Sequence, residues 1–216
     1  MTDAVGPETF RPACAPRRSR SRALGTVVLG LTVTGVFTGG LWAWIAPPIH
    51  AVVAITHTGE RVHDYLGNES QHFFDAPCLM LGLLSLVAIV TAVLVWQWRE
   101  HRGPGMVIAL AIGMVTGAGA AAAVGAALVW LRYGALNFDA IPLSADHKLA
   151  YVIQAPPVFF AQSPLQVMAT IVWPAAIAAL VYALIAAGSA RDDLGALRSA
   201  DQPPNALSVE PEASVS

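Results

Sequence analysis

The chain alternates between long apolar runs and shorter polar segments. Four runs contain no Asp, Glu, Lys, Arg or His at all, and they cover residues 23–49, 76–98, 103–131 and 149–190. Each run is at least as long as the roughly 20 apolar residues that a helix needs to cross the hydrocarbon core of a bilayer. The pattern therefore predicts four transmembrane helices, near residues 24–45, 76–98, 106–131 and 165–187.

The apolar runs predict helices and not a closed β-barrel. A backbone that crosses lipid must satisfy its own hydrogen bonds, and a helix does so within one segment. A barrel would show many short segments of alternating polarity, whereas these runs are apolar on every face. With 56% hydrophobic and 12% charged residues, we expect one membrane domain over residues 24–188. The polar tails, 1–23 and 189–216, are predicted to be disordered.

The positive charges are distributed unevenly about the four runs. Nine of the twelve Lys and Arg residues lie before the first run, in the connection after the second, or after the fourth. Such residues are retained in the cytoplasm when they lie in short segments beside transmembrane helices. We therefore expect a multi-pass plasma-membrane protein with both termini cytoplasmic and with outer loops at residues 46–75 and 132–164.

Tryptophans mark the ends of the predicted spans. An indole ring prefers the headgroup layer, where it is half buried and its N–H can reach water. Five of the six tryptophans fit this placement, namely Trp42, Trp44, Trp96, Trp98 and Trp130. Trp173 lies deeper, beside Pro174. Because proline removes a backbone donor, a kink with local rehydration would accommodate both residues.

Small residues recur at helical spacing in the first and third spans. Gly35 and Gly39 lie four residues apart in the first span, and Gly113 and Gly117 do so in the third. Small residues let helix backbones approach closely in lipid. In a four-helix chain we expect this spacing to serve packing within the molecule more than formation of a homo-oligomer.

No Asp, Glu, Lys, Arg or His lies within the predicted spans. Proton relays and ion pathways need buried ionisable groups or rings of polar ligands, so ion-coupled transport by one chain is disfavoured. The polar groups present are hydroxyls such as those of Thr32, Ser85 and Tyr182. We expect these hydroxyls to bond carbonyls of their own helices.

Motifs for catalysis are not found in the sequence. There is no phosphate loop, nucleophile elbow, pair of catalytic acids or cofactor motif. An intramembrane hydrolase would also need a nucleophile and a base within hydrogen-bond reach. We therefore expect no enzyme, no catalytic residue and no cofactor. The net charge of −2 also predicts no nucleic-acid partner.

The two outer loops contain β-prone runs. Residues 52–56 and 62–66 flank His57-Thr58-Gly59-Glu60, which predicts a hairpin whose turn takes its positive φ from Gly59. Residues 149–153 form a third candidate strand. The expected class is therefore an all-α membrane protein, a bundle of four transmembrane helices with a small β-containing cap on its outer end.

Histidines and carboxylates gather in these loops. If the hairpin forms, His57 and Glu60 bracket its turn and His63 and His72 approach them, and these side chains suit Zn²⁺ or a similar cation. The spacing matches no common metal motif, and alternate residues of a strand point to opposite faces. We therefore place a solvated polar surface ahead of a metal site. A pH-sensing role for the histidines stays open.

Short motifs in the loops and at the span ends complete the sequence pattern. They include Trp44-Ile45-Ala46-Pro47-Pro48, Tyr65-Leu66-Gly67-Asn68-Glu69, His101-Arg102-Gly103-Pro104-Gly105, Ala155-Pro156-Pro157-Val158-Phe159-Phe160 and Arg191-Asp192-Asp193-Leu194-Gly195. Over about residues 24–195, the chain resembles an actinobacterial, particularly mycobacterial, family of four-span membrane proteins of unknown function. The resemblance implies a bacterial plasma-membrane protein, and it brings no catalytic or binding residues.

Three functions are compatible with these features. The first is a non-enzymatic accessory or scaffold subunit of the cell envelope, whose outer loops meet a membrane-protein partner or another envelope component. The second is a small transporter or lipid-handling protein with an apolar pathway between its helices. The third is a metal or pH sensor that uses the outer-loop histidines.

Overall fold

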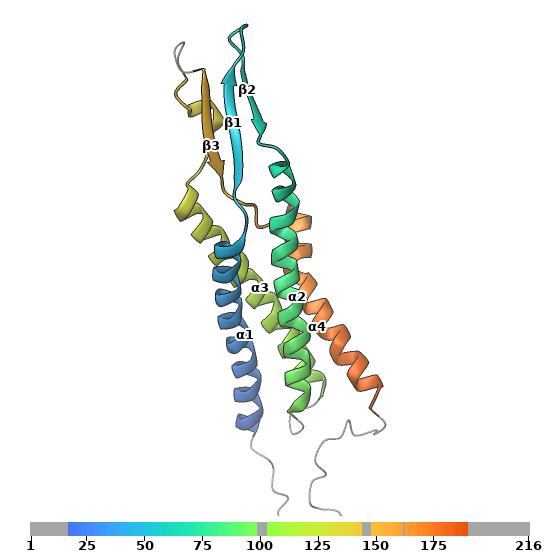
Figure 1. The fold of residues 1–216 in the computed structure, drawn as a ribbon. Coiled ribbons are helices and arrows are strands. Elements are labelled where there is room, and N and C mark those ends of the chain that lie inside the picture. Colours follow the sequence, from blue (N-terminus) through green and yellow to red (C-terminus); the bar gives the residue numbers. More distant parts are fainter. Residues whose placement is uncertain (1–16, 99–102, 144–147, 162, 190–216) are drawn as a thin grey trace, which may run out of the picture.

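The computed structural model describes residues 17–98, 103–143, 148–161 and 163–189. It contains a bundle of four long helices with a small antiparallel sheet beyond one end (Figure 1). We call this end of the bundle the cap end and the opposite end the far end. The predictions for residues 1–16 and 190–216 lie outside the described residues.

The four helices are each long and apolar enough to cross a membrane, as the sequence predicts. They are α1 (Arg17–Ile45), α2 (His72–Gln97), α3 (Pro104–Tyr133) and α4 (Pro164–Ala187). Helix α1 begins at Arg17, so the predicted disorder of residues 17–23 is wrong. This segment contains neither proline nor glycine, and its Arg and Ala residues favour helix, so the helix extends beyond its apolar part.

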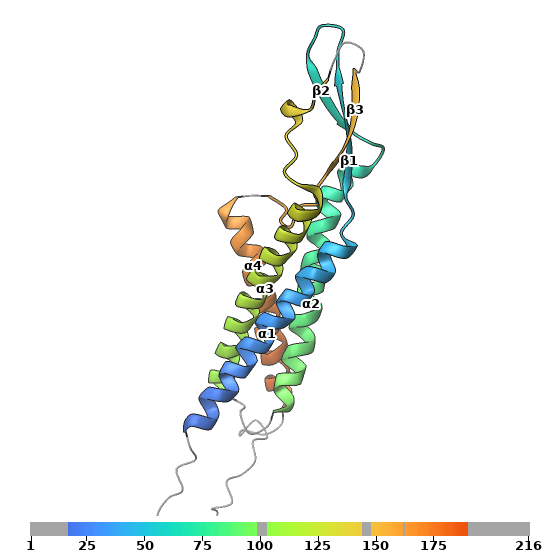
Figure 2. The same ribbon diagram turned by 90° about the vertical axis from the view of Figure 1, so that its left-hand side faces the viewer.

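Helix α1 packs mainly against α3 (Figure 2). A Cβ on Gly35 would overlap the backbone of Gly117, and a Cβ on Gly39 would overlap that of Ala121. The hydroxyls of Thr32 and Thr116 also meet across the contact, 2.9 Å apart. We call this contact the α1–α3 seam. Its glycines pack two helices of one chain, while self-association of the protein stays a prediction.

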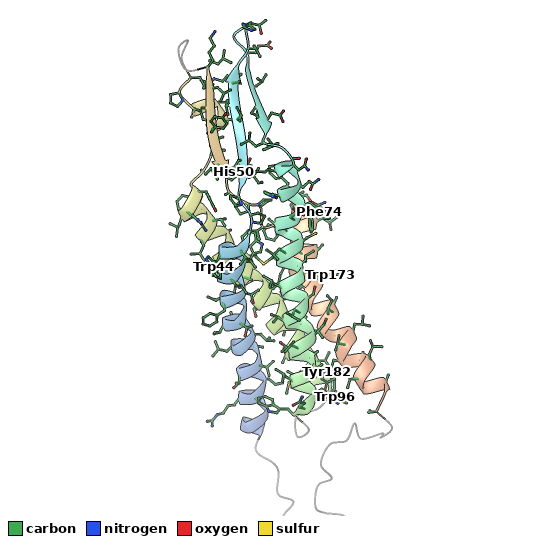
Figure 3. The ribbon with its side chains drawn as sticks, in the orientation of Figure 1. Trp44, His50, Phe74, Trp96, Trp173 and Tyr182 are labelled. Atoms are coloured by element: carbon green, nitrogen blue, oxygen red, sulfur yellow. The ribbon has the colours of Figure 1, made fainter. Side chains whose placement is uncertain are left out.

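Trp42 joins the seam to the cap end of α2. It is fully buried, and its indole N–H donates to the carbonyl of Ala76 at 2.8 Å. The prediction that this indole is half buried with its N–H in water is therefore wrong, because the N–H is satisfied by the backbone of another helix. The depth of Trp42 in the membrane stays a prediction. Trp44, two residues on, is 77% exposed and points away from the bundle (Figure 3).

Helix α4 packs against α2 and α3. The indole N–H of Trp173 donates to the hydroxyl of Ser85 on α2 at 3.1 Å, which gives this deep indole a protein partner. The Ser85 hydroxyl bonds the carbonyl of Leu81 in its own helix, as predicted. The buried Tyr182 hydroxyl has no hydrogen-bond partner, contrary to the prediction, while its ring packs edge-on against Trp96.

The sheet contains the strands β1 (Ile49–Ile55), β2 (Arg61–Tyr65) and β3 (Leu149–Gln154). Its order is β2-β1-β3 with antiparallel pairing throughout, so the predicted hairpin and third strand are confirmed. Gly59 in the β1–β2 turn has a φ of 85°, which glycine adopts without strain. Strand β1 begins shortly after α1 ends, so the central strand is held directly above the bundle (Figure 1).

Candidate functional site

One face of the sheet is covered by the protein itself. Ala51 and Val53 of β1 are buried on this face, and register places His63 and Tyr65 of β2 beside them. The segment around the short helix η3 (Phe138–Ala140) lies over them, with the Phe138 ring stacked on His63 at 4.5 Å between centroids. We call this the covered face.

The opposite face of the sheet is open. Successive residues of a strand point to opposite faces, and residues directly paired between strands share a face. The register therefore groups Val52, Ala54, Val62, Leu149, Tyr151 and Ile153 on one side. Of these, Tyr151 is 72% exposed, Leu149 52%, and Val62 and Ile153 46% each. We call this apolar surface the open face.

The charges of the sheet are divided between its two faces. Arg61 belongs to the covered face, and its guanidinium donates to the carbonyls of Phe138 and Ile141 at 3.2 and 2.9 Å. Lys148 lies opposite Ile55 and shares its face by register. Asp64 lies on the open face, opposite Val52. Among the described residues of the sheet, the open face thus carries an acidic group and neither Lys nor Arg.

A histidine–carboxylate pair lies where the sheet meets the helices. His50, labelled in Figure 3, has its Nδ1 2.7 Å from Glu69 Oε2. Glu69 belongs to the short helix η1 (Glu69–Gln71), which precedes α2. The backbone N–H of His50 also donates to this oxygen and lowers the pKa of Glu69. The rings of His50 and His72 act in the same direction, and partial desolvation opposes them. The pair ties η1 to the base of β1.

The four candidate metal ligands are spread along the cap. His57 and Glu60 lie in the exposed β1–β2 turn, whereas His63 stacks on Phe138. His72 lies at the start of α2, with its Nδ1 2.8 Å from the carbonyl of Pro48. No group of three or more His, Cys, Asp or Glu side chains placed to hold a metal occurs in the part of the chain that the structure describes. The geometry therefore adds nothing to the metal-site hypothesis.

A pocket of about 480 Å³ lies beneath the cap. Its walls come from the cap end of α3, the start of α2 and the segment that leads from β3 to α4. Most of its lining is apolar, including Phe73, Val129, Trp130 and Phe159. Gln154 also lines it, and the Oε1 atom of this residue is buried without a hydrogen-bond partner. The sequence analysis did not predict this pocket. The one signal in the sequence is a polar residue, Gln154, shortly before Pro156 and Pro157 in an otherwise apolar segment.

The structure and its relatives together define what kind of protein this is. The four apolar helices and the three-stranded cap define a helical protein of membrane type. Residues 31–196 match a family described as Protein of unknown function (DUF2567), and the chain belongs to this family. This match and the mycobacterial relatives described next confirm the resemblance to an actinobacterial family of unknown function.

The relatives come from mycobacteria and are uncharacterised themselves. A protein of Mycobacterium leprae is 66% identical over 195 residues, which cover 90% of this chain and 97% of that protein. A protein of Mycobacterium tuberculosis is 66% identical over 180 residues, which cover 83% of this chain and 93% of that protein. No solved structure matches the chain.

Proposed function

We propose that this protein is a non-enzymatic accessory subunit of the cell envelope, which uses the open face of its cap to hold a protein partner. The bundle anchors it in the plasma membrane. The cap lies on the extracytoplasmic side, and both ends of the chain lie in the cytoplasm. The distribution of Lys and Arg about the four apolar runs supports this orientation.

The open face is the observation that carries the proposal. Four of its apolar side chains, on the edge strands β2 and β3, are 46–72% exposed, and Val52 and Ala54 of the central strand lie between them. Contiguous apolar surface outside a membrane typically marks a protein contact. The covered face shows how this sheet buries its apolar side chains when a segment lies over them, and the open face has no such segment among the described residues.

The charges around the open face favour a partner other than a second copy of the chain. Asp64 lies on it, while Arg61 is turned to the other face and bonded to carbonyls there. Two copies joined through this face would bring like charges together, which disfavours the pairing. A partner with an apolar centre and a Lys- or Arg-rich rim is complementary to it.

Site-specific photo-cross-linking in native membranes tests the proposal. A benzophenone amino acid replaces Tyr151 on the open face or, as a control, His57 in the exposed turn. We expect one discrete heterologous product from position 151 and none from position 57. The Asp64→Lys substitution should remove most of this product, because it reverses the charge that the partner's rim meets.

Three results would contradict the proposal. One is a product that contains two differently tagged copies of this chain. Another is the same product from both positions, which would indicate collision and not docking. The third is a product whose yield is unchanged by Asp64→Lys, since the charge argument would then have no support.

A further inference from the structure

The pocket beneath the cap has the size and walls of a site for an apolar molecule. Its volume of about 480 Å³ falls within the range of ligand pockets, roughly 300–1,000 Å³. Aromatic and aliphatic side chains from α2, α3 and the segment after β3 form most of its walls, and no lining residue is charged. These walls favour a hydrocarbon chain, and they provide nothing to neutralise a phosphate or a carboxylate.

One polar atom among the residues that line the pocket is an acceptor without a donor. The Oε1 atom of Gln154 is buried and unpartnered, which is costly unless a ligand or a water supplies a donor. Pro156 and Pro157, which also line the pocket, have no backbone N–H and present carbonyls alone. A molecule that places a hydroxyl near Gln154 would supply the missing donor.

Exposed aromatic side chains surround the pocket at its own level on the bundle. Trp130 lines it and is 60% exposed, and Phe160, another lining residue, packs against the 62% exposed Phe74 at 5.4 Å between centroids. Trp44 is exposed at the same end of the bundle (Figure 3). Aromatic belts of this kind lie at the membrane–water interface. The pocket is thus at the depth where the polar heads of lipids lie.

We propose that this pocket binds one neutral membrane lipid with a hydroxyl head, such as a diacylglycerol. The acyl chain lies against Phe73, Val129 and Phe159, and the hydroxyl donates to Gln154 Oε1. This inference goes beyond the proposed function and does not depend on the open face. A phospholipid of the same chains should bind more weakly, because no lining residue of the pocket carries a positive charge that could neutralise its phosphate.

Photoaffinity labelling of the full chain in phospholipid vesicles tests the inference. The probe is a diacylglycerol with a diazirine in one acyl chain, and labelled peptides are located by mass spectrometry. We expect labelling of residues 126–134 and 155–161, and competition by unlabelled diacylglycerol. Gln154→Leu should lower the labelling about fivefold, the effect of one lost neutral hydrogen bond.

Two adjacent alanines of α3 provide a matched pair of variants. Ala126 lines the pocket, whereas Ala127 does not, and both side chains are exposed. We expect Ala126→Trp to fill the pocket and abolish labelling there, and Ala127→Trp to leave it unchanged. Because neither alanine is buried, both variants should fold, and equal elution from a sizing column checks this.

Several outcomes would overturn the inference. Equal labelling of the Ala126→Trp and Ala127→Trp variants would show that the probe reacts outside the pocket. Equal labelling by a phosphatidylglycerol that carries the same diazirine chain would refute the neutral head. Labelling that unlabelled diacylglycerol does not reduce in the wild-type protein would refute a saturable site, whatever the variants show.

Discussion

In the α1–α3 seam, the two helices are in direct backbone contact. A methyl group added to Gly35 or Gly39 of α1 would overlap the backbone of α3. In the cap, the same chain leaves an apolar sheet face with side chains up to 72% exposed. The seam depends on glycines, whose missing side chains let the two helices touch. The open face, by contrast, consists of apolar side chains that no described segment of the chain covers. The comparison separates residues that hold the molecule together from residues available to other molecules.

The largest expected effect concerns Trp42, where the seam meets α2. Trp42→Ala removes a fully buried ring and its 2.8 Å bond to the Ala76 carbonyl, so we expect a loss of about 3–5 kcal/mol in the free energy of unfolding. Trp44→Ala, on the exposed side of the same helix, should change it by less than about 0.5 kcal/mol. Unfolding in detergent, followed by tryptophan fluorescence, measures both, and similar losses would refute the distinction.

Two adjacent glycines of α1 allow a test of the seam, because only one of them contacts α3. Gly39→Val places a side chain into the backbone of Ala121 and should cost about 3 kcal/mol, since a helix must move to make room. Gly40→Val enters open space and serves as the control. The melting temperatures of the two variants in one detergent compare them. A Gly40→Val variant as unstable as Gly39→Val would mean that β-branching, and not overlap, is responsible.

The two faces of the sheet differ in the same way on a smaller scale. Val53→Ala on the covered face removes two buried methyl groups and should lower the free energy of unfolding by about 1.5 kcal/mol. Val62→Ala on the open face, where the side chain is 46% exposed, should cost less than about 0.5 kcal/mol in the isolated protein. Chemical denaturation of both variants makes the comparison. A larger loss for Val62→Ala would show that the open face is buried in the isolated protein.

The smallest effect concerns the junction between cap and bundle. Because the pKa of Glu69 is lowered in the folded state, its ionised form stabilises the protein above the ordinary value of 4.5. This contribution is lost as pH falls below that value through the lowered pKa of the folded state. Glu69→Gln should remove this part of the acid sensitivity. Thermal unfolding between pH 3 and 7 tests it, and identical slopes in variant and wild type would refute it.

The sequence predicts the four helices and the three strands well, because each follows from local patterns. Apolar runs long enough to cross a bilayer as helices predict the four helices. Gly59 between two β-prone runs predicts the hairpin. The glycine spacing predicts close helix contact, but the partner of Gly35 is not predicted, since Gly117 lies far along the chain. The spacing of the glycines predicts which face of a helix makes the close contact. It does not predict which other helix packs there, because that depends on the tertiary structure.

The candidate sites were harder to predict, because they depend on distant segments. Residues 149–154 are apolar on both faces of β3 except for Gln154, so alternation does not tell which face is covered. The covering segment around Phe138 decides this. Trp42 has the position of an interfacial indole, yet a carbonyl 34 residues away holds its N–H. The pocket likewise forms where segments from three parts of the chain meet.

The strand order of the cap has a consequence for the biogenesis of the protein. Strand β1 pairs with β2 through a short turn, but its other neighbour, β3, follows two complete helices later in the chain. During synthesis from the N-terminus, one edge of β1 therefore carries free N–H and C=O groups until α2, α3 and β3 have been made. A chaperone or protease that recognises strand edges without a pairing partner would thus distinguish incomplete chains from finished ones.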